Sequence, residues 1–338
     1  MPDTSSAELS HDGSKPIAEF RQHNVGSGSA CGHHGEILQG VFERDGEFVR
    51  GLVTLPCNAF SSRVSVTLER DAELVVQPPW KTKTRDAVVN ALDVLGAAPL
   101  YGGVVDVRSS IPVSRGFGSS TADVVAAIRA VGEALQCYLA PEDVAYIAVT
   151  SETACDPAMF NHCLLFAQRA GLVIEDFGVP LPPMQVVSFS LGSGNGIDTV
   201  DFTPAQYSAW EAEAFRVLLG LLRRGIHDSN IAQIGAVATA SARINFRHLP
   251  FPELEVAQGL VRATNAVGLQ VAHSGDVAGL LFPLSDPHID VALERAASSG
   301  LHDVRMLTVG HRTLGADPRR PAARTKMRKP VARERERT

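Results

Sequence analysis

The chain has 338 residues, of which 45% are hydrophobic and 20% are charged, enough to bury the core of one large domain or two ordinary ones. No apolar run approaches the roughly 18 to 20 residues of a membrane span, and the polar start of the chain lacks the pattern of a secretory signal, so we expect a cytoplasmic protein without membrane contact. The formal net charge of −6 argues against a partner held by its phosphate backbone, and we expect no nucleic-acid binding.

The two ends of the chain differ from its middle in composition. Residues 1–20 are rich in Ser, Asp and Gly without apolar periodicity, and residues 316–338 hold nine Lys or Arg against three acidic residues. Both patterns predict disordered tails, the second of them basic. Between the tails, Leu181-Pro182-Pro183 breaks the helical pattern and predicts a boundary between an N-terminal domain of residues 21–182 and a C-terminal domain of residues 183–315.

The first domain begins with strands and continues with helices. Antiparallel strands are predicted around residues 48–49, 63–68, 73–76 and 103–107. From Ser120 to Leu135 the apolar residues recur at helical spacing, which predicts a long amphipathic helix. A second helix should begin at Pro141, because a proline followed by two acidic residues suits the first turn of a helix.

The second domain shows the same mixture. Strands are predicted at residues 184–189, 269–272, 280–282 and 303–309, and helices at residues 207–224, 230–246, 252–268 and 290–297. We expect Gly225 to end the first of these helices, and Asp228 or Ser229 to cap the second. The two halves contain no repeated βαβ unit, so the expected fold class is α+β.

The segment from Ile111 to Thr121 carries the strongest chemical signal. A strand, a loop of small residues and a long helix follow one another here, and this order can form an anion cradle at the start of the helix. Gly116 and Gly118 would let the backbone approach a phosphate closely. An ordinary glycine-rich turn is equally compatible with the composition, and the loop is neither a Walker A motif nor a GxGxxG motif.

Three segments resemble the motifs of one enzyme superfamily. The string Pro-x-x-x-Gly-x-Gly-Ser-Ser-Thr, which ends at Thr121, resembles the second motif of the GHMP small-molecule kinases. Residues 32–40, Gly-His-His-Gly-Glu-Ile-Leu-Gln-Gly, are similar to the first motif in the form found in the L-threonine kinases of cobamide synthesis. Residues 270–282 are similar to the third motif, and residues 234–245 resemble that subfamily's preceding helix. The resemblance implies a GHMP kinase fold, with an N-terminal domain like the second domain of ribosomal protein S5 and a ferredoxin-like C-terminal domain.

The resemblance also implies a site for ATP and Mg²⁺. The nucleotide would bind at Pro112, Arg115, Gly116, Phe117, Gly118, Ser119, Ser120 and Thr121 of the second motif, and at Ser274 and Gly275 of the third. Mg²⁺ would bind Ser120 and Glu152. Asp156 matches the family's catalytic Asp, which would accept or orient the proton of the substrate hydroxyl. The subfamily usually shows Glu-Pro-Thr-Asp here, whereas Glu152 lies four residues before Asp156, and a helix-end turn with solvated acids is the alternative.

Other side chains of these segments are candidates for contacts with the acceptor. Glu36 and Gln39 would recognise its amino or carboxyl groups, and His273 would contact the acceptor or only fill its loop. His33 and His34 are adjacent, but neighbours in sequence rarely face one metal ion, so zinc is not favoured. A second acidic candidate, Asp198, is explained equally well by a turn. Five cysteines without a CxxC pair predict free thiols.

These features predict an ATP-dependent kinase that phosphorylates the hydroxyl of a small molecule, foremost a hydroxy amino acid such as L-threonine, giving O-phospho-L-threonine and ADP. Two alternatives stay open. One is a GHMP kinase that acts on a different hydroxy amino acid or alcohol in specialised biosynthesis. The other is a catalytically inactive regulator that binds a nucleotide or metabolite. The expected partner is the small-molecule acceptor, and the size of the chain also allows a homodimer.

Overall fold

The computed structural model describes residues 23–191, 205–248, 253–273 and 276–310. The strands in these ranges are β1 (His23–Arg44), β2 (Glu47–Arg70), β3 (Leu74–Gln77), β4 (Tyr101–Ser109), β5 (Leu164–Ala167), β6 (Leu172–Asp176), β7 (Met184–Ser190), β8 (Gly268–Val271), β9 (Val277–Phe282) and β10 (His302–Val309). The helices are α1 (Thr82–Val94), α2 (Ser119–Ala134), α3 (Pro141–Glu152), α4 (Ala209–His227), α5 (Ile231–Phe246), α6 (Glu253–Thr264) and α7 (Ile289–Ser298).

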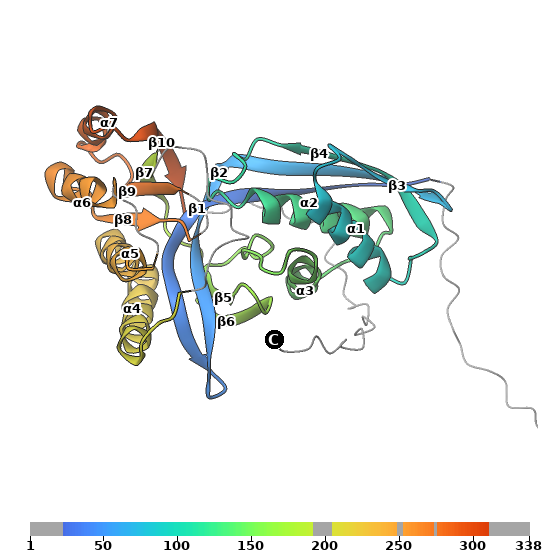
Figure 1. The fold of residues 1–338 in the computed structure, drawn as a ribbon, viewed down its shortest axis with the longest axis horizontal. Coiled ribbons are helices and arrows are strands. Elements are labelled where there is room, and N and C mark those ends of the chain that lie inside the picture. The colour runs from blue at the N-terminus through green and yellow to red at the C-terminus, as the bar shows by residue number, and fades with distance from the viewer. Residues whose placement is uncertain (1–22, 192–204, 249–252, 274–275, 311–338) are drawn as a thin grey trace, which may run out of the picture.

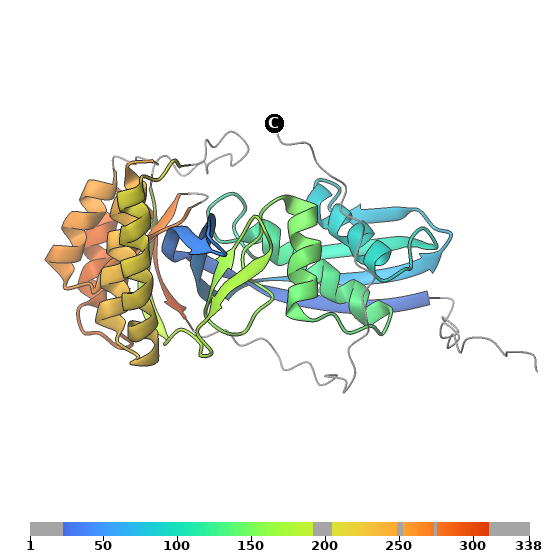
Figure 2. The ribbon, with the colours of Figure 1, turned by 90° about the horizontal axis from the view of Figure 1, so that it is seen from below.

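The strands form a single sheet that runs through the length of the molecule. Its main path is β10-β7-β9-β8-β1-β2-β4-β3, and off this path β5 pairs with β2 and β6 pairs with β5. Helices α1, α2 and α3 lie along one end of the sheet and α4 to α7 along the other (Figure 1), and the turned view shows the same elongated arrangement (Figure 2). None of the helices in the described ranges is long and apolar enough to cross a membrane.

The hairpin of β1 and β2 belongs to both ends of the molecule. Its antiparallel register runs from His23 opposite Glu69 to Arg44 opposite Glu47, with irregularities on both sides of Glu36. Such bulges bend a strand and re-aim its side chains. At the irregular stretch β1 also pairs with β8, through Glu36 opposite Val271. The hairpin therefore passes from the first half of the fold into the second.

Apolar side chains form separate cores on the two sides of this bend. The first core lies between the sheet and α1 to α3 and includes Val66, Val105, Val125, Ile128 and Ile147, all fully buried. The second joins the far part of the hairpin to α4 and α5 and includes Leu38, Phe42, Phe215, Leu222 and Val237. A third covers β7, β8 and β9 with α6 and α7. Burial of this apolar surface is what holds the helices on the sheet.

Most elements of the sequence prediction are confirmed. The strand β3, expected to be antiparallel, pairs with β4 in the parallel direction, because α1 connects the two strands. The other errors lie at helix ends. α4 passes Gly225 and ends at His227, because Gly225 packs closely on α5, where an added Cβ would be 3.2 Å from Ile234 Cγ1. α5 is capped by Asn230, whose side chain accepts a hydrogen bond from Gln233 N at 3.0 Å, and not by Asp228 or Ser229. α6 ends at Thr264 and not at residue 268.

Some predictions were incomplete and others lie outside the described residues. The sequence patterns did not reveal α1, β1, β5 or β6, and they predicted two short strands where the single long strand β2 lies. Residues 1–20 and 316–338, the predicted tails, lie outside the described ranges, as do Asp198, Ser274 and Gly275. The boundary between residues 182 and 183 stays a prediction.

Candidate active site

The loop predicted to hold phosphate connects β4 to α2. Its backbone is left-handed at Ser114, Gly116 and Gly118, with φ of 59°, 89° and 70°, a region that glycine adopts without steric cost. Gly118 is the N-cap of α2, and no side chain caps the helix there. The N–H groups of the first turn of α2 can therefore bind an anion, with the positive end of the helix dipole behind them.

Glu152 places its carboxylate directly on the first turn of α2. Ser120 Oγ donates to Glu152 Oε2 at 2.7 Å, and Thr121 Oγ1 donates to Glu152 Oε1 at 2.7 Å. Burial raises the pKa of Glu152 to about 7, and the two hydroxyls oppose this rise. Carboxylate and hydroxyl oxygens are the hard donors that Mg²⁺ prefers, so Ser120 and Glu152 fit a magnesium ion beside a bound phosphate.

Asp156 meets a histidine that sequence analysis did not assign to it. His33 Nε2 lies 3.0 Å from Asp156 Oδ2, and Asp156 N donates to Thr121 Oγ1 at 3.3 Å. Burial alone would raise the pKa of Asp156, but His33 lowers it to about 2. The carboxylate is therefore ionised at neutral pH and held in one orientation. Gly118 makes room for this pair, because a Cβ there would be 2.4 Å from His33 Cδ2.

Glu36 and His273, both predicted to contact the acceptor, bind each other. Glu36 Oε2 accepts a hydrogen bond from His273 N at 2.7 Å, and the ion pair between Glu36 Oε1 and His273 Nδ1 spans 3.0 Å. Although burial opposes it, the carboxylate of Glu36 raises the pKa of His273 to about 9. His273 lines the pocket described below, whereas Glu36 is buried behind it.

The pair of Asp156 and His33 lies beside the pair of Glu36 and His273. The charges of the four side chains compensate one another. His33 Nδ1 is 3.8 Å from Glu36 Oε1, which links Asp156, His33, Glu36 and His273 into one chain of alternating acids and bases. Ligand atoms of His33, Glu36 and Asp156 lie within 4.8 Å of one another, close enough to hold a metal ion. With two histidines of raised pKa facing two carboxylates, the chain is balanced by its own charges. His34 is not part of it: burial lowers its pKa to about 4, and its Nδ1 contacts Gln270 Oε1 at 2.7 Å.

Three residues of the second motif do not line the pocket that the next paragraph describes. Arg115 forms ion pairs with Asp276, at 2.9 Å, and with Asp303, and so ties the loop to the region beside β9 and to β10. Phe117 is buried, with its ring against Phe60 and His34. Pro112 is half-buried beside the loop.

One pocket of about 1090 Å³ connects the phosphate loop to the second half of the fold. Its first side, which we call the phosphate wall, consists of Gly116, Gly118, Ser119, Ser120, Thr121, Glu152 and Asp156. Another part of its lining, which we call the Tyr207 wall, consists of Gln39, Arg50, Tyr207, Asn245 and His248. Trp80, Lys81 and Lys83 also line the pocket, and Lys81 forms an ion pair with the buried Asp123. Of the Tyr207 wall, sequence analysis found only Gln39.

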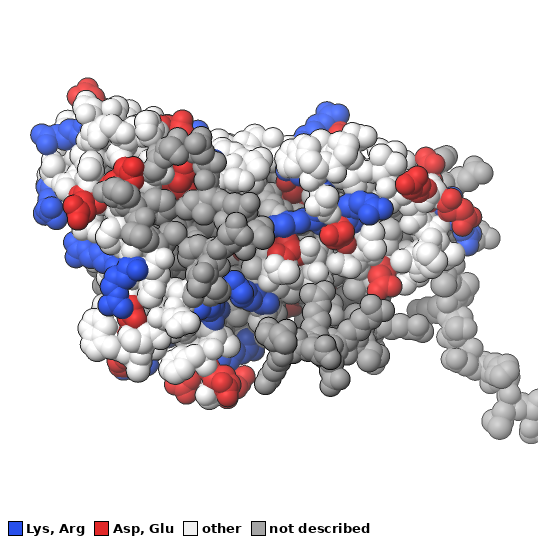
Figure 3. All heavy atoms as spheres, viewed as in Figure 1, with Lys and Arg blue, Asp and Glu red and all other residues white. Residues whose placement is uncertain are grey.

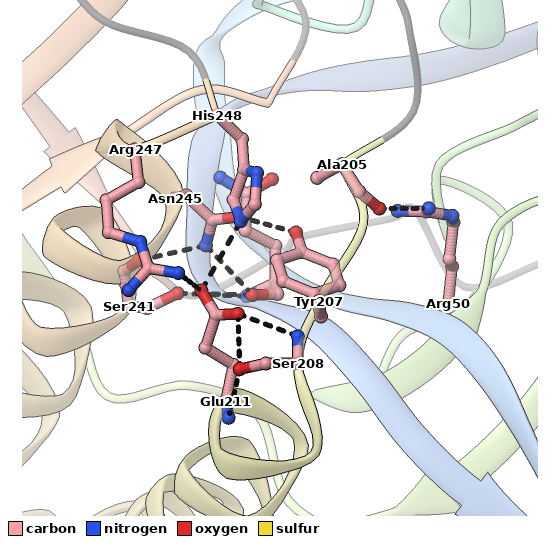
Figure 4. Close-up of polar contacts among 10 residues, drawn as sticks. Arg50, Ala205, Tyr207, Ser208, Glu211, Ser241, Asn245, Arg247 and His248 are labelled. Carbon is pink, nitrogen blue, oxygen red and sulfur yellow. Dashed lines mark hydrogen bonds and ion pairs between the residues drawn. The ribbon is translucent and has the colours of Figure 1, made fainter.

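The Tyr207 wall is a connected polar network (Figure 4). The Tyr207 hydroxyl donates to Asn245 Oδ1 at 2.6 Å, and Asn245 Nδ2 donates to the carbonyl oxygen of Gln39 at 3.0 Å. Glu211 lies behind this wall and contacts Arg247 at 2.8 Å and His248 at 3.3 Å. On the face shown in Figure 3, basic and acidic side chains of the described residues are interspersed and form no broad patch of one sign.

Comparison with known proteins finds a family match that includes part of this pocket. Residues 85–163, which include the phosphate loop, α2, α3 and Asp156, match the model of the GHMP kinases N terminal domain. This part of the chain is a GHMP kinases N-terminal domain. The L-threonine kinase of Salmonella typhimurium is 32% identical over 180 residues, a match that covers 52% of this chain and 59% of that relative's length.

Solved structures extend the likeness to the whole fold. A homoserine kinase from Cytophaga hutchinsonii superposes with a TM-score of 0.63 at 15% identity, covering 90% of this chain and 98% of that one. A structure described as MDDEF in complex with MVAPP, AMPPCP and magnesium has a TM-score of 0.62 at 15% identity, covering 84% and 96%. The predicted resemblance to GHMP kinases and the predicted mixed helix and strand fold are therefore confirmed.

Proposed function

We propose that this protein is an ATP-dependent kinase that phosphorylates the hydroxyl of a small molecule, foremost a hydroxy amino acid such as L-threonine. The observation that carries the proposal is that two carboxylates with different partners face the same uncapped helix start. Glu152 lies on Ser120 and Thr121, and Asp156 is held ionised by His33. The similarity to an L-threonine kinase and to a homoserine kinase structure supports an amino acid as acceptor.

In this proposal the phosphate wall aligns the reactants. The N–H groups at the start of α2 would bind phosphate oxygens, and Ser120 and Glu152 would hold Mg²⁺, which would neutralise charge on the phosphates. Asp156 accepts the hydrogen bond of the acceptor hydroxyl and orients its oxygen toward the terminal phosphorus. As the new oxygen–phosphorus bond forms and the bond to ADP breaks, the hydroxyl proton leaves toward Asp156. Positioning and charge neutralisation are the main demands of this transition state.

His33 keeps the carboxylate of Asp156 ionised and fixes its position. A carboxylate with a pKa near 2 is a weak base, so its main contribution is a fixed, ionised acceptor that aligns the hydroxyl before the proton moves. The buried ring of His33 packs against Gly118 and Asp156 together and thus fixes the carboxylate relative to the phosphate loop.

The test is ADP release from ATP and Mg²⁺ with a panel of L-threonine, L-homoserine, L-serine and non-proteinogenic hydroxy amino acids. Turnover with one or more of them, and the phosphorylated hydroxyl identified by NMR, is the expected result. Turnover with another hydroxy compound but not with L-threonine would support the proposed kinase activity and show that the acceptor is a different compound. A rise in melting temperature with ATP but no turnover with any acceptor would contradict the proposal and favour a nucleotide-binding regulator.

A further inference from the structure

One half-buried arginine of the pocket has no carboxylate partner among the described residues, whereas Lys83 and Arg169, which also lack an ion pair there, are exposed. Arg50 of β2 is half-buried and belongs to the Tyr207 wall. Its described contacts are a hydrogen bond that it donates to the carbonyl oxygen of Ala205 and the ring of Tyr207, whose centre lies 5.5 Å from the guanidinium carbon. A guanidinium carries five N–H donors in a planar fork that matches a carboxylate. Arg50 therefore keeps donors for a ligand in the pocket.

The neighbouring cations are already compensated. Glu211, 1% exposed, lies 2.8 Å from Arg247 and 3.3 Å from His248, and Figure 4 shows both side chains converging on it. On the other side of the pocket, Lys81 is paired with Asp123. A half-buried charge without a partner is costly, and a bound anion would compensate it. Arg50 is thus the cation of the Tyr207 wall whose charge an anionic group of a ligand would compensate.

The surroundings of Arg50 hold it in place. The ring beneath it, Tyr207, is fixed by its hydroxyl on Asn245 and by edge contacts with Phe215 and His248, each with ring centres 5.1 Å apart. Asn245 is fixed in turn by the backbone of Gln39. A binding group held by packed neighbours loses little freedom when a ligand arrives, and this favours both affinity and discrimination.

We infer that Arg50 is the specificity-determining residue that binds a carboxylate of the acceptor, so that the pocket selects hydroxy acids over their uncharged amides. The inference rests on the proposed function, since it takes the compound that is phosphorylated as the ligand. Asp156 and Arg50 line the same pocket, the first in the phosphate wall and the second in the Tyr207 wall. The acceptor would place its hydroxyl at Asp156 and its carboxylate in the fork of Arg50, above the Tyr207 ring.

The experiment compares each hydroxy amino acid of the panel that turns over with its carboxamide, for example L-threonine with L-threoninamide. The wild-type protein should prefer the acid in kcat/KM. Arg50→Gln should lower kcat/KM for the acid by about 100-fold, as expected when one partner of a buried charge pair is lost. The kcat/KM for the amide and the KM for ATP should not change. The kcat/KM of Arg50→Lys for the acid should lie between the values of the wild-type protein and Arg50→Gln, because lysine keeps the charge but lacks the planar fork of donors. Arg63→Gln, an exposed arginine of the same strand outside the pocket, is the matched control.

Three results would overturn the inference, and they separate it from the proposed function. If the wild-type protein uses acid and amide equally, the kinase proposal stands and no carboxylate is recognised. If Arg50→Gln weakens both acceptors alike and lowers the melting temperature, Arg50 has a structural role and does not determine specificity. If the wild-type protein turns over no acceptor of the panel, both the proposed function and the inference fall.

Discussion

The two walls of the pocket are built in different ways. The phosphate wall comes from one continuous loop and helix start, with Glu152 at the end of α3 and Asp156 just after that helix. The Tyr207 wall is assembled from β1, β2, the end of α5 with the residues after it, and the segment before α4, whose residues are far apart in sequence. Under the proposed function, the first wall would supply the groups that phosphoryl transfer requires of any acceptor, and the second could vary without disturbing them. The comparison then teaches that this fold can carry chemistry and specificity on separate parts of its chain.

The sharpest test of the phosphate wall is Asp156→Asn. The amide keeps the shape of the carboxylate but cannot accept the hydroxyl proton, so kcat should fall by about 10²- to 10⁴-fold. ATP affinity, measured by calorimetry with a non-hydrolysable analogue, should stay within a few-fold. Retained turnover would show that Asp156 does not take part in the reaction and that the phosphate wall lacks the proposed group that accepts the hydroxyl proton.

Glu152→Gln should act on Mg²⁺ and not on the acceptor. Loss of the anionic oxygen should raise the Mg²⁺ concentration at half-maximal rate by at least about tenfold, while the KM for the acceptor changes little. A titration of rate against Mg²⁺ at saturating ATP measures this. An unchanged Mg²⁺ requirement would mean that Glu152 only orders Ser120 and Thr121.

Arg115→Met tests whether the phosphate wall depends on its link to the second half of the fold. The change leaves the buried carboxylate of Asp276 without its partner and should lower the free energy of unfolding by roughly 1–3 kcal/mol. The KM for ATP should rise several-fold because the loop loses its anchor, whereas the KM for the acceptor should not. Arg216→Met, which removes an exposed pair with Glu213, is the control and should change neither.

The smallest expected effect concerns pH and the pair of Glu36 and His273. The folded-state pKa of His273, about 9, is above its ordinary value of 6.5, so the pair stabilises the fold fully below pH 6.5 and loses this contribution as pH rises through 9. His273→Asn should therefore lower the melting temperature by a few degrees at pH 6.5 and by less at pH 10. An equal difference at both pH values would show that the ion pair does not stabilise the fold.

The sequence was sufficient for the parts of the site that are local. Gly116 to Thr121 form a cradle because their order of loop and helix start dictates it. The unusual spacing of Glu152 left its position open, and the structure resolves it, since α3 ends there and Thr153 turns the chain in a left-handed conformation with φ of 63°. What the loop binds remains a prediction.

Contacts over long distances in the chain could not be predicted in this way. His33 and Asp156 are 123 positions apart, and the bulged β1 brings them together only in the folded sheet. Arg115 lies in the motif but turns toward Asp276 and Asp303, because these carboxylates approach it from the second half of the fold. The Tyr207 wall has no motif, so only the close approach of β1 and α5, at Gln39 and Asn245, reveals it.

The passage of the β1 and β2 hairpin through both halves affects how this scaffold can be re-engineered. Leu38 and Phe42 near the hairpin tip fill the same core as Phe215 and Leu222, so a cut between residues 182 and 183 would strip the later helices of part of their interior. A chimaera meant to exchange acceptor preference with a relative should transplant the hairpin tip together with α4 and α5. The transplanted segment must keep glycine at position 40, since a methyl group added there would lie 2.5 Å from the Phe215 ring.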